Sequence, residues 1–100
     1  PAPRRSRPVT AAVPSSDEVL DVVRGAVVTV LEVDPATVQP GTRLREDLDA
    51  DSLALVEIVE IVEERLAARA PHFHVEDEEL DGLRTVGEAV ELAVRRLSGT

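Results

Sequence analysis

The stretch of sequence that decides the fold is residues 46–66, "EDLDADSLALVEIVEIVEERL". It opens with alternating aspartates, and a serine, Ser52, follows the last of them directly. From there apolar side chains return every three or four residues, which is the spacing of one face of an α-helix. We therefore predict a helix from about Ser52 to Arg69, ended by Pro71, with the serine at its N-terminus.

This predicted helix has two different sides. Its core face carries five aliphatic residues, Leu55, Ile58, Val59, Val62 and Leu66. Acids and aliphatic residues are mixed on or beside its outward side, namely Leu53, Val56, Glu57, Glu60, Glu63 and Glu64. A purely structural helix needs no aliphatic residues on its outer side, although scattered ones are common. The mixture therefore favours recognition of a protein partner.

A first helix is predicted upstream of this stretch. Ser15 with Glu18 three positions later matches a capping box, and valines at helical spacing follow it. The helix should end at "VDP", residues 33–35, because the residue before a proline is pushed out of the α region.

Two more helical segments are predicted near the C-terminus. "EDEELDG", residues 76–82, is long enough only for a short helical turn. "TVGE", residues 85–88, is a second capping box that opens a last helix, with Gly99 just past its end. The apolar positions of this helix are Val86, Ala89, Val90, Ala93, Val94 and Leu97.

The long connection at residues 34–51 contains two prolines and a glycine, and it also contains three spaced apolar residues, Val38, Leu44 and Leu48. Long loops in compact domains are usually functional or internally packed, so we expect these three residues to pin it across the helices. The predicted fold is all-α. It is a small four-helix bundle with three long helices, a short third helix, and a long loop between the first and second.

The N-terminal residues 1–14, "PAPRRSRPVTAAVP", carry four prolines and three arginines. This composition predicts a flexible linker or tail. The single domain is then residues 15–100.

Composition excludes several classes of protein. The 100-residue chain has no cysteine, so it can form no disulfide, thiolate metal site or cysteine nucleophile. The absence of cysteine fits a reducing compartment, so we expect a cytoplasmic location. The chain has no run of 18 apolar residues, so we expect no membrane span. All 20 acids lie from Asp17 onward, and eight of them lie between Glu46 and Glu64 with no base among them. Such a surface repels nucleic acid and anionic membranes and attracts basic partners, unless it serves solubility alone.

The acidic turn could hold a calcium ion. Asp47, Asp49 and Asp51 fill positions 1, 3 and 5 of an EF-hand loop. Position 6 is Ser52 where glycine is required, and position 12 is Ile58 where a glutamate is required. These two mismatches argue against a metal site.

A serine nucleophile is the second possibility for the turn. It needs a base within reach, yet the only histidines, His72 and His74, lie beyond a helix about 25 Å long. The one aromatic residue, Phe73, offers little with which to line a pocket. Two interpretations of the role of Ser52 then remain. Its hydroxyl accepts a phosphate group at the helix N-terminus, or Ser52 or Asp51 simply caps the helix for about 1 kcal/mol.

Residues 47–66 resemble the signature of acyl carrier proteins, a D-S-L motif followed by the second helix of that family. "VDPATVQPGTRLREDL", residues 33–48, is similar to the family's long first loop. "FHVEDEELDGLRTVGEAVELA", residues 73–93, resembles its loop into the third helix and the start of the fourth. Two departures are Asp49, where the family often has glycine, and a shorter loop after Phe73.

The resemblance implies a carrier that catalyses no reaction itself. Ser52 matches the serine that a Mg²⁺-dependent phosphopantetheinyl transferase esterifies with 4′-phosphopantetheine from coenzyme A. The thiol of that arm carries acyl groups as thioesters, and Asp51 matches the aspartate that supports the transferase reaction. The residues that match the family's recognition helix are Leu53, Val56, Glu57, Glu60, Glu63 and Glu64. The partners implied are the transferase, the ketosynthase, the acyltransferase and other synthase domains with basic patches, and the isolated domain is expected to be monomeric.

The linker composition and the missing initiator Met favour a carrier domain of a multidomain polyketide synthase. A discrete fatty-acid or polyketide carrier is the alternative. A peptidyl carrier is disfavoured because its G-G-x-S-L motif is absent. An acidic protein-interaction module, in which Ser52 is only part of a cap, is the alternative from a different functional class.

Overall fold

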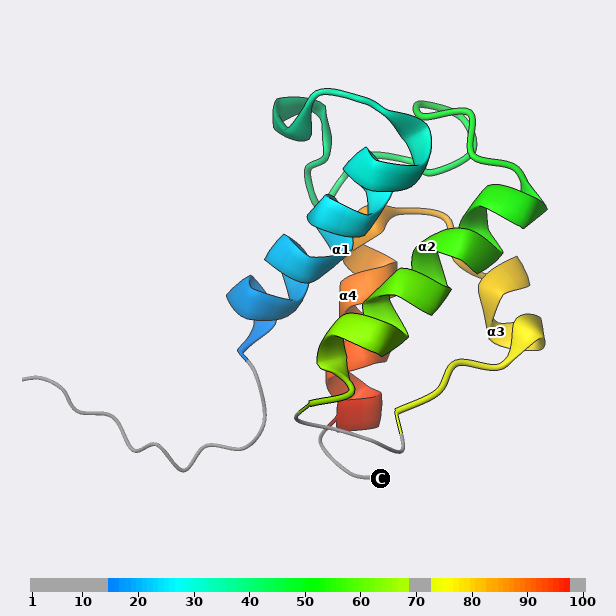
Figure 1. Ribbon diagram of the computed structural model, residues 1–100. Helices are drawn as coiled ribbons and strands as arrows, with labels where there is room; N and C mark the ends of the chain where they lie inside the picture. Colours follow the sequence, from blue (N-terminus) through cyan, green and yellow to red (C-terminus); the bar gives the residue numbers. More distant parts are fainter. Residues whose placement is uncertain (1–14, 69–72, 98–100) are drawn as a thin grey trace, which may run out of the picture.

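The computed structural model describes residues 15–68 and 73–97 (Figure 1). The predicted linker at 1–14 and the residues Arg69, Pro71 and Gly99 lie outside the described residues. The second helix ends at Leu66, earlier than the predicted Arg69, and residues 67–68 form a turn. The elements are α1 (Ser16–Leu31), the 3₁₀ turn η1 (Pro35–Thr37), α2 (Ser52–Leu66), α3 (Asp77–Asp81) and α4 (Val86–Leu97). The all-α prediction, with three long helices and a short third one, is confirmed.

Local capping fixes the ends of α1. The Ser15 hydroxyl accepts a hydrogen bond from the Glu18 backbone N–H at 3.2 Å, and the Glu18 carboxylate accepts one from the Ser15 N–H at 3.0 Å. The helix closes at Glu32, which adopts the left-handed conformation with φ of 57°. The predicted capping box and helix end are both confirmed.

The start of α4 differs in one contact from the prediction. The Thr85 hydroxyl accepts from the Glu88 N–H at 3.1 Å, as a capping box requires. The Glu88 carboxylate, however, accepts from the Arg84 N–H at 2.7 Å. The returning half of the capping box is thus shifted by one residue. At this point the chain forms a bridge between Arg43 and Thr85, so tertiary pairing overrides the local motif.

The loop between α1 and α2 is attached to the start of α4 by backbone hydrogen bonds. The Leu44 N–H donates to the Arg84 carbonyl at 2.8 Å. In return, the N–H groups of Val86 and Gly87 donate to the carbonyls of Thr42 at 2.9 Å and Pro40 at 2.8 Å. Two of the amides that a helix N-terminus leaves unsatisfied therefore find partners in the loop.

Side chains of the same loop complete its attachment. Val38, Leu44 and Ala50 are buried, and Leu48 is half-buried against the core. The prediction that Val38, Leu44 and Leu48 pin the loop is confirmed, and Ala50 joins them.

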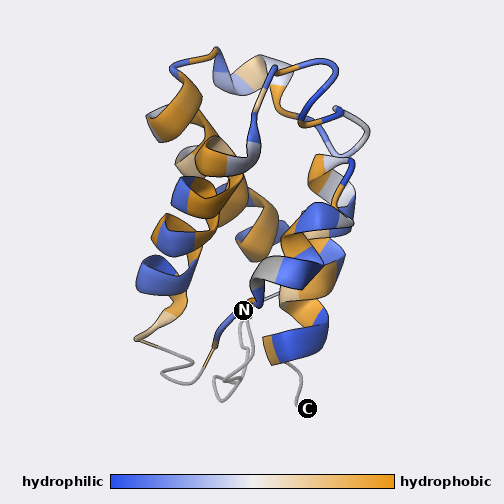
Figure 2. Ribbon diagram, turned by 90° about the vertical axis from the view of Figure 1, so that its right-hand side faces the viewer, coloured by the Kyte–Doolittle hydropathy of each residue, from blue (hydrophilic) through white to orange (hydrophobic). Residues whose placement is uncertain are grey.

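Helix α1 packs against both α2 and α4, and α3 lies against α2. Figure 2 shows hydrophobic and hydrophilic residues alternating along the helices, as expected where one face of each is buried. Of the predicted core face of α2, Leu55, Ile58, Val62 and Leu66 are buried, and Val59 is half-buried. Leu92 is also buried although it lies off the predicted apolar stripe of α4. It faces Phe73, Val75 and Leu83, so α4 is covered on a second side.

The close contact between α4 and the loop makes Gly87 sensitive to substitution. A Cβ at Gly87 would lie 2.9 Å from the Pro40 carbonyl oxygen, a backbone atom that hydrogen bonds hold in place. We expect Gly87→Ala to lower the free energy of unfolding by about 1–3 kcal/mol, measured by urea denaturation.

Gly25→Ala is the matched control for this substitution. Its Cβ would meet only the end of the flexible Arg65 side chain, so the higher helix propensity of alanine should raise stability by up to about 1 kcal/mol. Equal effects of the two substitutions would contradict the proposed contact at Gly87.

Candidate functional site

Ser52 is the first residue of α2 and is exposed. The residue before it, Asp51, is the N-cap, and its carboxylate accepts a hydrogen bond from the Ala54 N–H at 2.9 Å. The sequence left open whether Ser52 or Asp51 caps the helix, and the structure assigns the cap to Asp51. The Ser52 hydroxyl therefore has no capping role and stands at the positive end of the helix dipole.

A cation contacts this hydroxyl. Nη2 of Arg45 lies 3.3 Å from the Ser52 Oγ and donates to it. Sequence reasoning missed this contact because Arg45 lies in the irregular turn before α2, so its separation of seven residues from Ser52 has no fixed geometry. The one feature of the sequence that could have indicated this contact is the position of Arg45, immediately before the acidic residues that lead to Ser52.

The three aspartates of the turn make different contacts. Asp47 accepts from the Arg43 backbone N–H at 2.9 Å and pairs with its guanidinium at 3.4 Å. These contacts lower the pKa of the Asp47 carboxyl, the backbone hydrogen bond contributing most. Asp51 caps α2, whereas Asp49 is exposed with φ of 59°. Within residues 15–68 and 73–97, no group of acids and histidines is arranged to hold a metal ion.

The backbone conformation of Asp49 generates a stability prediction. A left-handed conformation is strained for a residue with a Cβ, and glycine adopts it without that cost. We expect Asp49→Gly to raise the free energy of unfolding by about 0.5–1 kcal/mol in urea denaturation. Asp49→Asn, which removes the charge and keeps the Cβ, should give a smaller gain. A gain from asparagine equal to that from glycine would assign the effect to charge.

The outward side of α2 is less uniform than predicted. Leu53 is 67% exposed, and Glu57, Glu60 and Glu64 are exposed around it. Val56 is half-buried. Glu63 is also half-buried, because its carboxylate accepts the Val75 N–H at 2.8 Å and lies 3.0 Å from Nδ1 of His74. Val56 and Glu63 therefore lie at the edge of the outward side of α2, and Leu53, Glu57, Glu60 and Glu64 form its exposed part.

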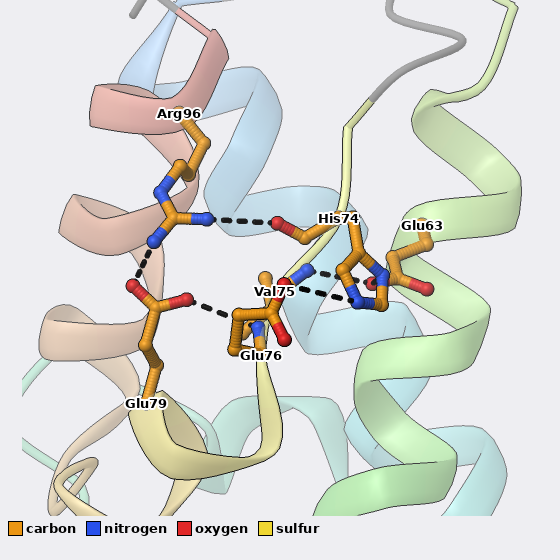
Figure 3. Close-up of polar contacts among 6 residues, drawn as sticks. All are labelled: Glu63, His74, Val75, Glu76, Glu79 and Arg96. Carbon is orange, nitrogen blue, oxygen red and sulfur yellow. Dashed lines mark hydrogen bonds and ion pairs between the residues drawn. The ribbon is translucent and has the colours of Figure 1, made fainter.

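Figure 3 shows that Glu63 belongs to a polar cluster that ties the segment before α3 to the bundle. The Arg96 guanidinium donates to the His74 carbonyl at 3.0 Å and also pairs with Glu79. The other carboxylate oxygen of Glu79 accepts from the Glu76 N–H at 3.0 Å. His74 is thus engaged with Glu63, about three helical turns from Ser52, and it makes no contact with the serine hydroxyl. His72 lies outside the described residues.

This cluster should make stability depend on pH. The Glu76 N–H, and after it Arg96, lower the pKa of Glu79 against the opposing effect of burial. A carboxyl with a lowered folded-state pKa contributes stability that is complete above its unfolded-state pKa. That contribution is lost as the pH falls through the folded-state value.

We therefore expect the melting temperature of the wild type to fall more than that of Glu79→Gln between about pH 7 and about pH 3. Glu78→Gln, at an exposed neighbouring position, is the control and should follow the wild type. Parallel pH profiles for the wild type and Glu79→Gln would contradict the assignment.

The interior next to α3 is closely packed. A cavity of only about 30 Å³ lies between α2, α4 and the segment at Phe73–Val75, enough for one or two water-sized groups. Its lining is apolar and includes Ile58, Val62, Phe73 and Leu92. In the described part of the chain, no helix has the length and apolar character that crossing a membrane requires.

Comparisons with known proteins bear on this site. The family described as "Phosphopantetheine attachment site" matches residues 21–93. A protein named acyl carrier protein from Acidothermus cellulolyticus is 36% identical over 77 residues, which cover 77% of this chain and 86% of that protein. A protein of the same name from Rubrobacter xylanophilus is 38% identical over 78% of this chain and 90% of that protein. Another, from Thermosynechococcus vestitus, is 36% identical over 77% of this chain and 89% of that protein.

Proposed function

Because the chain belongs to the acyl carrier protein family, we propose that Ser52 is the residue to which its phosphopantetheine is attached. The cofactor of this family is a covalently bound 4′-phosphopantetheine, and its members act as carriers together with phosphopantetheinyl transferases and synthase enzymes. When bound, the group supplies the thiol that this cysteine-free chain lacks.

The observation that carries the assignment is the geometry of Ser52. Its hydroxyl is exposed at the first residue of α2, and Asp51 supplies the helix cap in its place. A phosphate attached at this position would be favoured by the helix dipole by about 0.3–1 kcal/mol. The residues present therefore fit the group.

We assign Asp51 a supporting role in the loading reaction. Its carboxylate is adjacent to Ser52, and the Ala54 N–H fixes its position at 2.9 Å. The same hydrogen bond that caps the helix therefore holds a carboxylate beside the hydroxyl that the transferase, with its Mg²⁺, must modify.

The recognition surface we propose is centred on Leu53, with an acidic surround. Leu53 supplies an apolar anchor, and Glu57, Glu60 and Glu64 supply exposed negative charge. Val56 and Glu63 contribute from the edge, since both are half-buried. Such a surface suits basic patches on a phosphopantetheinyl transferase, a ketosynthase or an acyltransferase, with association that weakens at high salt.

For the pathway, we propose a carrier domain at residues 15–100 of a multidomain polyketide synthase in the cytoplasm, with residues 1–14 as its linker. The proline- and arginine-rich composition of residues 1–14 supports this. The small internal cavity supports a cargo that stays outside the core. The alternative, a discrete fatty-acid or polyketide carrier, is supported by the relatives, whose name is acyl carrier protein.

The test is to incubate the chain with coenzyme A, Mg²⁺ and a broad-specificity phosphopantetheinyl transferase, and to measure the intact mass. We expect the mass to rise by one phosphopantetheine in the wild type and not in Ser52→Ala.

Ser16→Ala is the matched control, because Ser16 is likewise an exposed first residue of a helix whose cap is the residue before it. This variant should still be loaded. A wild-type chain that gains no mass would instead support an acidic interaction module that is never modified.

A further inference from the structure

A cleft lies between the loop before α2 and the segment that follows α3, and Arg45, which contacts the Ser52 hydroxyl, is one of its lining residues. It is lined by Arg43, Arg45, Glu46, Asp81, Leu83 and Arg84. Three of the eleven arginines of a chain with net charge −9 are therefore gathered around one hollow.

These arginines differ in their partners. Arg43 pairs with Glu46 at 2.6 Å and with Asp47 at 3.4 Å, so its charge is compensated. Within residues 15–68 and 73–97, the guanidinium groups of Arg45 and Arg84 form no ion pair. Among the described residues, the Arg45 guanidinium makes only its 3.3 Å contact with the neutral Ser52 hydroxyl.

A guanidinium is poorly matched to a single neutral hydroxyl. Its planar set of N–H donors suits an anion with several oxygens, and bonds to phosphate are shorter and about twice as strong as bonds between neutral groups. The oxygen that Arg45 contacts is also the oxygen that would carry the phosphate.

The backbone immediately before Arg45 is held in place. Its neighbour Leu44 is buried, donates to the Arg84 carbonyl at 2.8 Å and accepts from the Ala50 N–H at 2.9 Å. Arg45 is thus presented from an anchored segment, next to the turn that leads into Ser52.

We propose that Arg45 binds the phosphodiester of the group on Ser52 and directs the pantetheine arm into this cleft, along Leu83 and Arg84. The proposal rests on the function proposed above. It also explains how a second negative charge is accommodated next to Asp51, since the Arg45 guanidinium offsets the repulsion between them. An arm held in the cleft leaves exposed Leu53 available to partner enzymes.

The experiment begins with loading, so that the two proposals can fail separately. The wild type, Arg45→Gln, Arg45→Lys and Arg95→Gln are each loaded and checked by intact mass. Absence of the mass increase in the wild type would overturn the proposed function itself. The test of Arg45 is then made only on protein shown to carry the arm.

The decisive quantity is the melting temperature of the loaded form minus that of the unloaded form. Without the phosphate, Arg45→Gln should melt close to the wild type, because it loses only a weak hydrogen bond. In the loaded form it should lose a charge-assisted bond. The loading-induced shift should therefore be lower than in the wild type by about 4 °C or more.

Two variants control for charge. Arg95→Gln removes the same charge from an exposed position of α4 and should show the wild-type shift. Arg45→Lys keeps the charge without the planar donors and should lie between the wild type and Arg45→Gln. Equal loading-induced shifts in the wild type and Arg45→Gln would overturn the phosphate contact.

The direction of the arm is tested by NMR on the loaded protein. We expect nuclear Overhauser effects between the arm and the Leu83 methyl groups, and a change in the ³¹P shift in Arg45→Gln but not in Arg95→Gln. Overhauser effects to Leu53 in place of Leu83 would overturn the proposed path.

Discussion

The structure depends on the backbone pairing between the loop at residues 40–44 and the start of α4. Leu44, Val86 and Gly87 donate hydrogen bonds across this junction, and the Leu44 side chain is buried beneath it. Because buried amides need partners, neither segment can shift without leaving the other unsatisfied. The turn that presents Ser52 begins directly after this junction, so the position of the hydroxyl follows from contacts made far away in the sequence.

The acidic residues of the chain serve separate purposes. Asp51 caps α2, and Asp47 closes the turn on Arg43. Glu63 holds the segment before α3 from the far end of the same helix. Glu57 and Glu60 make no such contact within the described part of the chain and are exposed, as a surface for basic partners requires. The net charge alone does not distinguish these purposes, because they differ in which backbone amide each carboxylate reaches.

The sequence predicts helix starts and ends correctly where they depend on residues only a few positions apart. The Ser15 capping box, the "VDP" at residues 33–35 and the serine at the start of α2 are each read within a few residues, and each agrees with the structure. The same local reasoning does not show that Glu63 is half-buried, because helical spacing cannot reveal that the Val75 N–H comes within hydrogen-bonding distance. It also misses Leu92, whose burial depends on Phe73 and Leu83.

The sequence by itself determined four helical segments, a long pinned loop and a serine at a helix N-terminus, since capping, proline and apolar spacing act over one or two turns of chain. Only the tertiary structure decided that Asp51 and not Ser52 caps α2, and that Arg45 lies against the serine hydroxyl. It also decided that Arg43, Arg45 and Arg84 line one cleft. The physical reason is that these contacts depend on how the irregular loop folds against α4. Hydrogen bonds between segments distant in the sequence produce no regular spacing of residues from which they could be predicted.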